Sequence, residues 1–238
     1  MAAKIGGVIL LRRLAVIGLA LVAPPALAQV DPSIVEATAG YWFLADADTG
    51  KGCNLHLLAD EAIGGHAIEA PANCTIGTVS ADDIAAWNFD GNGGMVLIDA
   101  VRHVLFRVQE QEYGAWTSDE GGKSIALTPS EDGVAALPVP RLLTGTWTLR
   151  RPDGPPLCSL TLADKPPPGG EESFALSVAD GCDTAIRNLH LATWRVEGVT
   201  LMLYGSDGHS LALLGEAAGG YRKAPKEGGK PLVMTRAP

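Results

Sequence analysis

The sequence contains the same small framework of residues twice. A Gly-x-Trp motif, two cysteines and a later tryptophan recur in the same order, with Trp147 lying 105 residues after Trp42. A repeat of this length indicates two copies of one small domain, because solenoid repeats are only about 20–50 residues long. One fold must therefore accommodate both copies. The first framework comprises Trp42, Cys53, Cys74 and Trp87, and the second comprises Trp147, Cys158, Cys182 and Trp194.

Residues 1–28 have the features of a secretory signal peptide. Basic residues precede the apolar run 14–23, and the small-residue pattern Ala26-Leu27-Ala28 follows it, so we expect cleavage before Gln29. The run is shorter than the roughly 20 apolar residues that a membrane span requires. The sequence therefore predicts a periplasmic or secreted protein without a membrane span.

The charge of the chain argues against a nucleic-acid partner. The formal net charge is −9, and it becomes −12 without the three basic residues of segment 1–28. Nucleic-acid binding requires patches of Lys and Arg that neutralise phosphates.

Export makes disulfides available to stabilise two domains of modest size. Four cysteines allow three connectivities, and the repeat favours Cys53 with Cys74 and Cys158 with Cys182, because each copy then closes its own loop. Each bridge should contribute about 3 kcal/mol. The spacings contain no Cys-x-x-Cys pair, so we expect neither a metal site nor a cofactor.

Short alternating segments between Gly, Asp, Asn and Pro clusters predict an all-β fold. Segment 53–57 places Cys53, Leu55 and Leu57 on one face, and segment 158–162 repeats this pattern. We expect two tandem small eight-stranded antiparallel, lipocalin-like β-barrels, with Trp42, Trp87, Trp147 and Trp194 in their cores. The strands expected in the first copy are Tyr41–Asp46, Cys53–Leu58, His66–Ala70, Thr75–Val79, Ile84–Asp90, Met95–Asp99, Val101–Gln109 and Gln111–Trp116.

These patterns divide the chain into four parts. Residues 1–28 are the signal peptide, 29–117 the first barrel domain and 142–238 the second. Residues 118–141, rich in Gly, Ser, Asp, Glu and Pro, are expected to be a linker. The apolar triplet at 232–234 is a candidate for closing the second barrel, with a frayed end as the alternative.

The combined pattern resembles the bacterial alkaline protease inhibitor family, as a tandem duplication. Members of that family inhibit secreted serralysin-type zinc proteases, and the domain also occurs in an outer-membrane lipoprotein. The matching residues of the first copy are Ala39-Gly40-x-Trp42-x-Leu44, Cys53-x-Leu55-x-Leu57, Cys74, Trp87, Val96-Leu-Ile-Asp99 and Phe106. Those of the second are Gly145-x-Trp147-x-Leu149, Cys158-x-Leu160-x-Leu162, Cys182, Trp194, Leu201-Met-Leu203, Asp207-Gly208 and Tyr221.

The resemblance implies that a short N-terminal trunk enters the protease cleft and brings the mature N-terminus close to the catalytic zinc. An extended segment can occupy a substrate groove, and a terminal amine or carbonyl can bind zinc at its open position. Carried onto this sequence, the trunk is residues 29–37, and the residues expected to contact the protease are Gln29, Val30, Asp31, Pro32 and Ser33.

The sequence departs from the family pattern in three ways. Gln29 can cyclise at a new N-terminus, which would leave only a carbonyl as zinc ligand. Asp31-Pro32 replaces the small and apolar residues usual in the family. The duplication gives only the first copy a free leading segment, so we expect one inhibitory copy and one accessory copy in a monomer.

Other functions remain open at this point. The five histidines form no recognised metal or nucleophile motif, so we expect no enzymatic activity. A lipocalin-like carrier of a small ligand is one alternative, although several large apolar residues leave little room in so small a barrel. A cell-envelope interaction or structural module with the same barrel is the other, because fold does not determine function.

Overall fold

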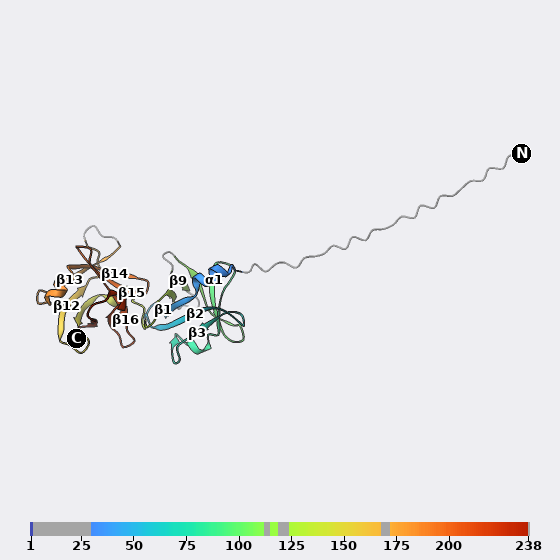
Figure 1. The fold of residues 1–238 in the computed structure, drawn as a ribbon, viewed down its shortest axis with the longest axis horizontal. Coiled ribbons are helices and arrows are strands. Elements are labelled where there is room, and N and C mark those ends of the chain that lie inside the picture. The colour runs from blue at the N-terminus through green and yellow to red at the C-terminus, as the bar shows by residue number, and fades with distance from the viewer. Residues whose placement is uncertain (2–29, 112–114, 119–123, 168–171, 238) are drawn as a thin grey trace.

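The computed structural model contains two closed antiparallel barrels of eight strands each, lying side by side (Figure 1). It describes Met1 and residues 30–111, 115–118, 124–167 and 172–237. The expected signal peptide and Gln29 lie outside the described residues. No helix in the described ranges is long and apolar enough to cross a membrane. The predicted all-β fold of two small barrels is confirmed.

The first barrel follows a short helix, α1 (Pro32–Thr38). Its strands are β1 (Gly40–Asp46), β2 (Gly52–Ala62), β3 (Gly65–Glu69), β6 (Ala86–Phe89), β7 (Gly94–Ile98), β8 (Val104–Glu110), β9 (Trp116–Ser118) and β10 (Ile125–Pro129). Outside this ring lie the hairpin of β4 (Thr75–Ile76) and β5 (Val79–Ser80) and a 3₁₀ helix at Ala81–Asp83.

The second barrel follows a shorter helix, α2 (Pro140–Leu143). Its strands are β11 (Gly145–Arg150), β12 (Pro156–Leu162), β13 (Phe174–Val178), β14 (Leu191–Glu197), β15 (Thr200–Gly205), β16 (Ser210–Gly215), β17 (Tyr221–Lys223) and β18 (Val233–Arg236). α3 (Thr184–Arg187) connects β13 to β14, and a 3₁₀ helix lies at Pro225–Glu227. β18 pairs with β11, so the apolar triplet at 232–234 contributes to closing this barrel.

The first barrel differs from the expected one in three strands. The strand expected at Gln111–Trp116 is observed as β9, which begins only at Trp116, and residues 112–114 lie outside the described residues. The segment Thr75–Val79 was expected as a barrel strand, but it forms the separate β4–β5 hairpin. The closing strand is β10, which pairs with β1 with Leu44 opposite Leu127 and lies within the expected linker 118–141. Its apolar run, 125–127, is only three residues long and is surrounded by turn-forming residues, which explains why composition indicated a linker.

The repeat extends to the register of the strands. β1 and β2 place Trp42 opposite Leu55, and β11 and β12 place Trp147 opposite Leu160. The cysteines Cys53 and Cys158 occupy equivalent positions, opposite Leu44 and Leu149. Both predicted disulfides are present, Cys53–Cys74 and Cys158–Cys182, with Cα–Cα distances of 5.9 and 4.2 Å. Each disulfide ties β2 or β12 to the segment that follows the next barrel strand.

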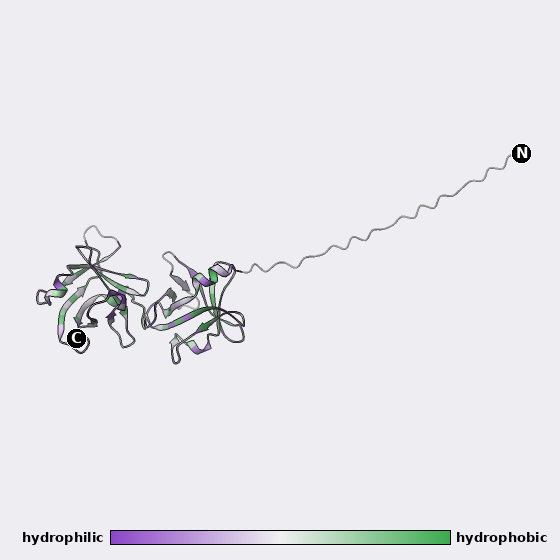
Figure 2. Cartoon of the chain, in the orientation of Figure 1, coloured by the Kyte–Doolittle hydropathy of each residue, from purple (hydrophilic) through white to green (hydrophobic). Residues whose placement is uncertain are grey.

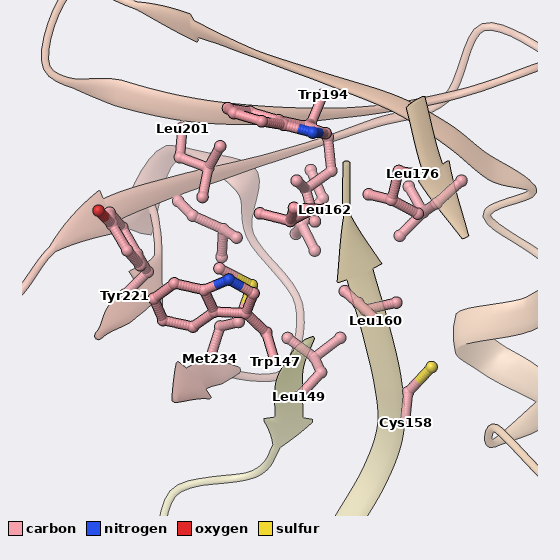
Figure 3. Packing of buried hydrophobic residues seen from close by; sticks show 14 of the residues in the cluster. Trp147, Leu149, Cys158, Leu160, Leu162, Leu176, Trp194, Leu201, Tyr221 and Met234 are labelled. Carbon is pink, nitrogen blue, oxygen red and sulfur yellow. The ribbon is translucent and has the colours of Figure 1, made fainter. Parts of the chain in front are cut away.

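Alternation along the strands fills both barrels with apolar side chains. In β12, Cys158, Leu160 and Leu162 are buried while Ser159 and Thr161 are exposed, and Figure 2 shows such alternating hydropathy along the strands. Trp194 and Trp147 lie on opposite sides of the leucines of the second core, with Tyr221 beside Trp147 (Figure 3). The four tryptophans of the framework, Trp42, Trp87, Trp147 and Trp194, are all buried.

A third apolar cluster joins the two barrels. β1 is buried on both faces, because Trp42 and Leu44 point into the first barrel while Phe43 packs between the barrels. Leu214 of β16 lies in the same cluster, and both Phe43 and Leu214 are fully buried. The other buried members of the cluster are Ala45, Val134, Val199, Ala212 and Ala224.

Polar contacts surround this interdomain cluster. The guanidinium of Arg222 donates to the carbonyl of Gly133 at 2.8 Å, and Ala136 forms a β-bridge with Gly215. The ammonium of Lys226 lies 3.5 Å from the Glu131 carboxylate. The end of the expected linker is therefore part of the interface.

We expect truncation of Phe43 to weaken this interface. Phe43→Ala removes a fully buried aromatic ring, which should lower the free energy of unfolding by about 3 kcal/mol in urea denaturation. Tyr41→Ala is the matched control, since Tyr41 lies on the same outer face of β1 but is 39% exposed, and it should cost less than about 1 kcal/mol. If the two variants lost the same free energy of unfolding, the proposed role of Phe43 in the interface would be contradicted.

Candidate functional site

The start of the first barrel domain is helical where an extended trunk was expected. The Asp31 carboxylate accepts hydrogen bonds from the backbone N–H and the hydroxyl of Ser33, at 2.9 and 2.8 Å. These bonds lower the pKa of Asp31, because they stabilise its charged form. Pro32 occupies the first turn, where its missing N–H costs nothing. The expected extended segment 29–37 therefore ends at Asp31, because Asp-Pro-Ser is an efficient helix start.

α1 is fixed to the end of the barrel by one apolar contact and one hydrogen bond. Val35 is 5% exposed and packs into the first core. The indole N–H of Trp42 donates to the carbonyl of Thr38 at 2.8 Å. Because Trp42 is itself part of the core, α1 has a defined position on the barrel. The chain that precedes α1 therefore leaves the barrel at a defined point.

The expected trunk residues have different environments. Gln29 lies outside the described residues. Val30 is half-buried and packs against the first core, whereas Asp31, Pro32 and Ser33 are exposed. The structure thus places Val30 against the barrel and the other three at the start of the helix.

A groove of about 590 Å³ lies between α1 and the hairpin formed by β2 and β3. Its lining is partly apolar, and Glu36 and Glu61 add two carboxylates without any lining Lys or Arg. Sequence reasoning did not find this groove, since its walls come from four separate segments. The lining residues are Val30, Pro32, Val35, Glu36, Ala59, Glu61, Ala62, Gly65, His66, Asn88, Phe89 and Gly91.

The second barrel repeats the helix and its hydrogen bond, but the segment that precedes its helix is bound to the first barrel. The indole N–H of Trp147 donates to the carbonyl of Leu143, at the end of α2, at 2.7 Å. The segment before α2 is held by the first barrel, because the N–H of Leu137 donates to the carbonyl of Gly50 at 2.8 Å. Arg141 also forms an ion pair of 2.8 Å with Asp48. The segment that leads into the second copy is therefore held by contacts with the first barrel.

A further polar cluster, in the second barrel, consists of Asp207 and two histidines. Among the described residues, no group of three or more His, Cys, Asp and Glu side chains is arranged to hold a metal ion. His190 and His209 both contact the Asp207 carboxylate, at 2.6 and 3.0 Å, and lower the pKa of Asp207. The three side chains lie at a surface turn, and their contacts are consistent with fixing that turn.

A comparison with protein families identifies the chain. The model described as "Protease inhibitor Inh" matches residues 34–128 and again residues 137–236. The chain belongs to the protease inhibitor Inh family. Each Inh match covers one barrel, and the first includes most of β10, in agreement with the observed closure of that barrel. No curated protein and no solved structure matches the chain significantly.

Membership of the Inh family indicates a protease inhibitor, and hence a protease as its partner. The first Inh match begins at Ile34, within α1, so the expected contact residues from Gln29 to Ser33 precede it. The two disulfides fit an oxidising compartment outside the cytoplasm.

We expect the position of α1 to depend on Val35. Val35→Asp places a charge in the core and should release α1, which hydrogen exchange would detect as faster exchange at the N–H of Ala39, now bonded to the carbonyl of Val35. The neighbouring exposed residue supplies the control, since Glu36→Gln should leave exchange unchanged. Protection that persists in Val35→Asp would show that α1 is held by other contacts.

Proposed function

We propose that this protein inhibits a serralysin-type zinc metalloprotease, with the segment before α1 entering the protease cleft. The observation that carries the proposal is the rigid attachment of α1 to the barrel in a chain of the Inh family. A segment with a fixed exit point loses little conformational entropy on binding, which favours tight inhibition.

The part that enters the cleft is shorter than the trunk expected from the sequence. Pro32 and Ser33 belong to the first turn of α1, so residues up to Asp31 are available for extension. Gln29 would then lie nearest the protease zinc, with a terminal amine or carbonyl as ligand. We further propose export to the periplasm or beyond, where such a protease would be met.

One inhibitory site per chain follows from the asymmetry between the copies. The segment before α2 is bound to the first barrel through Leu137 and Arg141. It would have to give up these polar contacts to enter a cleft, whereas Val30 before α1 would give up only its packing against the first core.

The alternatives have less support. Side chains fill the interior of the second barrel, as Figure 3 shows, and this packing opposes a role as carrier of a small ligand. An envelope interaction module would share the fold, but family membership favours inhibition.

Removal of Gln29 and Val30 should abolish inhibition. The deletion removes the half-buried Val30 but leaves Asp31 in place to cap α1, so the melting temperature should fall only slightly while the inhibition constant for a serralysin-type protease rises by at least about 100-fold. Asp31→Asn is the control for the cap, because Asn also caps helices well and should preserve stability. Full potency of the deletion variant would refute the cleft-entry mechanism.

Titration should give one protease bound per chain. Increasing amounts of the purified protein are added to a fixed amount of active enzyme, and residual activity is extrapolated to zero. An end point at one equivalent is expected because only the first copy has an available leading segment. An end point of two enzymes per chain would contradict the proposed asymmetry.

A further inference from the structure

Exposed apolar side chains are distributed unequally between the two barrels. Ile63 and Val101 are 72% and 70% exposed in the first barrel. Among the described residues of the second barrel domain, Leu142 at its start is the only exposed large hydrophobic side chain, at 47%. Both copies form the same barrel, so exposed side chains that only one copy carries are not required by the fold.

Ile63 and Val101 lie on two turns that touch each other. Ile63 is at the tip of the β2–β3 hairpin, and Val101 is in the turn between β7 and β8. A Cβ built on Gly64 would lie 2.5 Å from Cδ1 of Ile98 and 3.5 Å from Cγ of Arg102, so the hairpin tip packs directly against the β7–β8 turn. The two exposed side chains therefore belong to neighbouring turns, and we call them the apolar tip.

The turn that carries Val101 is held rigidly. The Asp99 carboxylate accepts hydrogen bonds from the N–H groups of Val101 and His103, at 2.9 and 2.7 Å. In the second barrel, Asp207 accepts from the N–H of His209 at 3.2 Å in the equivalent turn between β15 and β16. Both turns thus contain an aspartate that fixes the turn, but in the register of the strands Asp207 lies two positions later than Asp99.

The apolar residue of this turn is not repeated. The pair Ile98–Val104 of the first barrel corresponds to the pair Tyr204–Ser210 of the second, so Asp207 occupies the position of Val101. Turn formation therefore does not explain the exposed valine. A rigidly held apolar side chain costs little entropy to bury against a partner.

The apolar tip is continuous with the groove beside α1. Ala62, next to Ile63, lines that groove and also packs on the small outer cluster that contains Ile98. A partner whose cleft receives the segment before α1 would therefore cover the groove and reach the tip.

We propose that Ile63 and Val101 form a second contact with the protease, beside the cleft that the leading segment enters. This inference rests on the proposed function. The facing protease surface should be apolar opposite the tip and basic opposite Glu36 and Glu61, the two carboxylates of the groove. The contact would also favour binding through the first barrel over binding through the second.

The test compares inhibition constants for the mature protein against a purified serralysin-type protease that the wild type inhibits. The double variant Ile63→Ser and Val101→Ser should weaken inhibition by about 10- to 100-fold, as is common when central apolar contacts are lost. The melting temperature should be unchanged, because both side chains are exposed. If the double variant is less stable than the wild type, Val101→Ser alone provides the comparison.

Leu142→Ser is the matched control, since Leu142 is an apolar residue, 47% exposed, on α2. Its inhibition constant should stay within about twofold of the wild type. Equal inhibition by the wild type and the tip variant would overturn this inference and leave the proposed function intact. Absence of inhibition by the wild type, tested against several such proteases, would overturn both.

Discussion

One hydrogen bond, present in both copies, fixes the short helix that precedes each barrel. The indole N–H of Trp42 donates to the carbonyl of Thr38, and Trp147 donates in the same way to Leu143. Each tryptophan is part of a barrel core, so the bond transmits the rigidity of the core to the short helix before it. α1 can then present the preceding chain in one direction. The groove beside α1 and the neighbouring hairpin tip can contact the same partner as the preceding chain only if this direction is fixed.

The short helix that precedes the barrel has a different role in each of the two copies. In the first copy the helix follows the segment that we propose enters the protease cleft, whereas in the second it follows a linker bound to the first barrel. The interdomain cluster around Phe43 and Leu214 makes the second barrel a support for β1, the strand that directly follows α1. The second copy thereby contributes to the site without a free segment of its own.

The sequence predicted the parts of the fold that depend on local pattern and on the repeat. Alternation around Cys158 indicated the inner face of β12, and the repeated order of cysteines indicated both disulfides. It did not predict β10, because a strand's role in closing a barrel depends on a partner more than seventy residues earlier, in β1. It also missed α1, although Asp31-Pro32-Ser33 is a helix start that could have been found.

The site was less predictable than the fold, because it consists of residues that are distant in the sequence and close only in the folded structure. The continuous apolar run from Trp42 to Ala45 could have indicated a strand buried on both faces, and hence an interface. No comparable signal marks the groove or the contact between the Ile63 and Val101 turns. The residues that line the groove and form the two turns are far apart in the sequence, and only the folded sheet brings them together.

The pairing of β1 with β10 also determines the order in which the molecule can be assembled. β1 precedes every other strand of the first barrel in the chain, yet one of its two edges stays unpaired until residues up to Pro129 have been synthesised. During that interval the outer face of β1, with Phe43, is uncovered, since β16 of the second barrel emerges later still. The Cys53–Cys74 bridge closes a much shorter loop and can form well before either event. In a chain exported as we propose, the first disulfide would therefore be available to restrict the movement of β1 before β10 and the second barrel have been added.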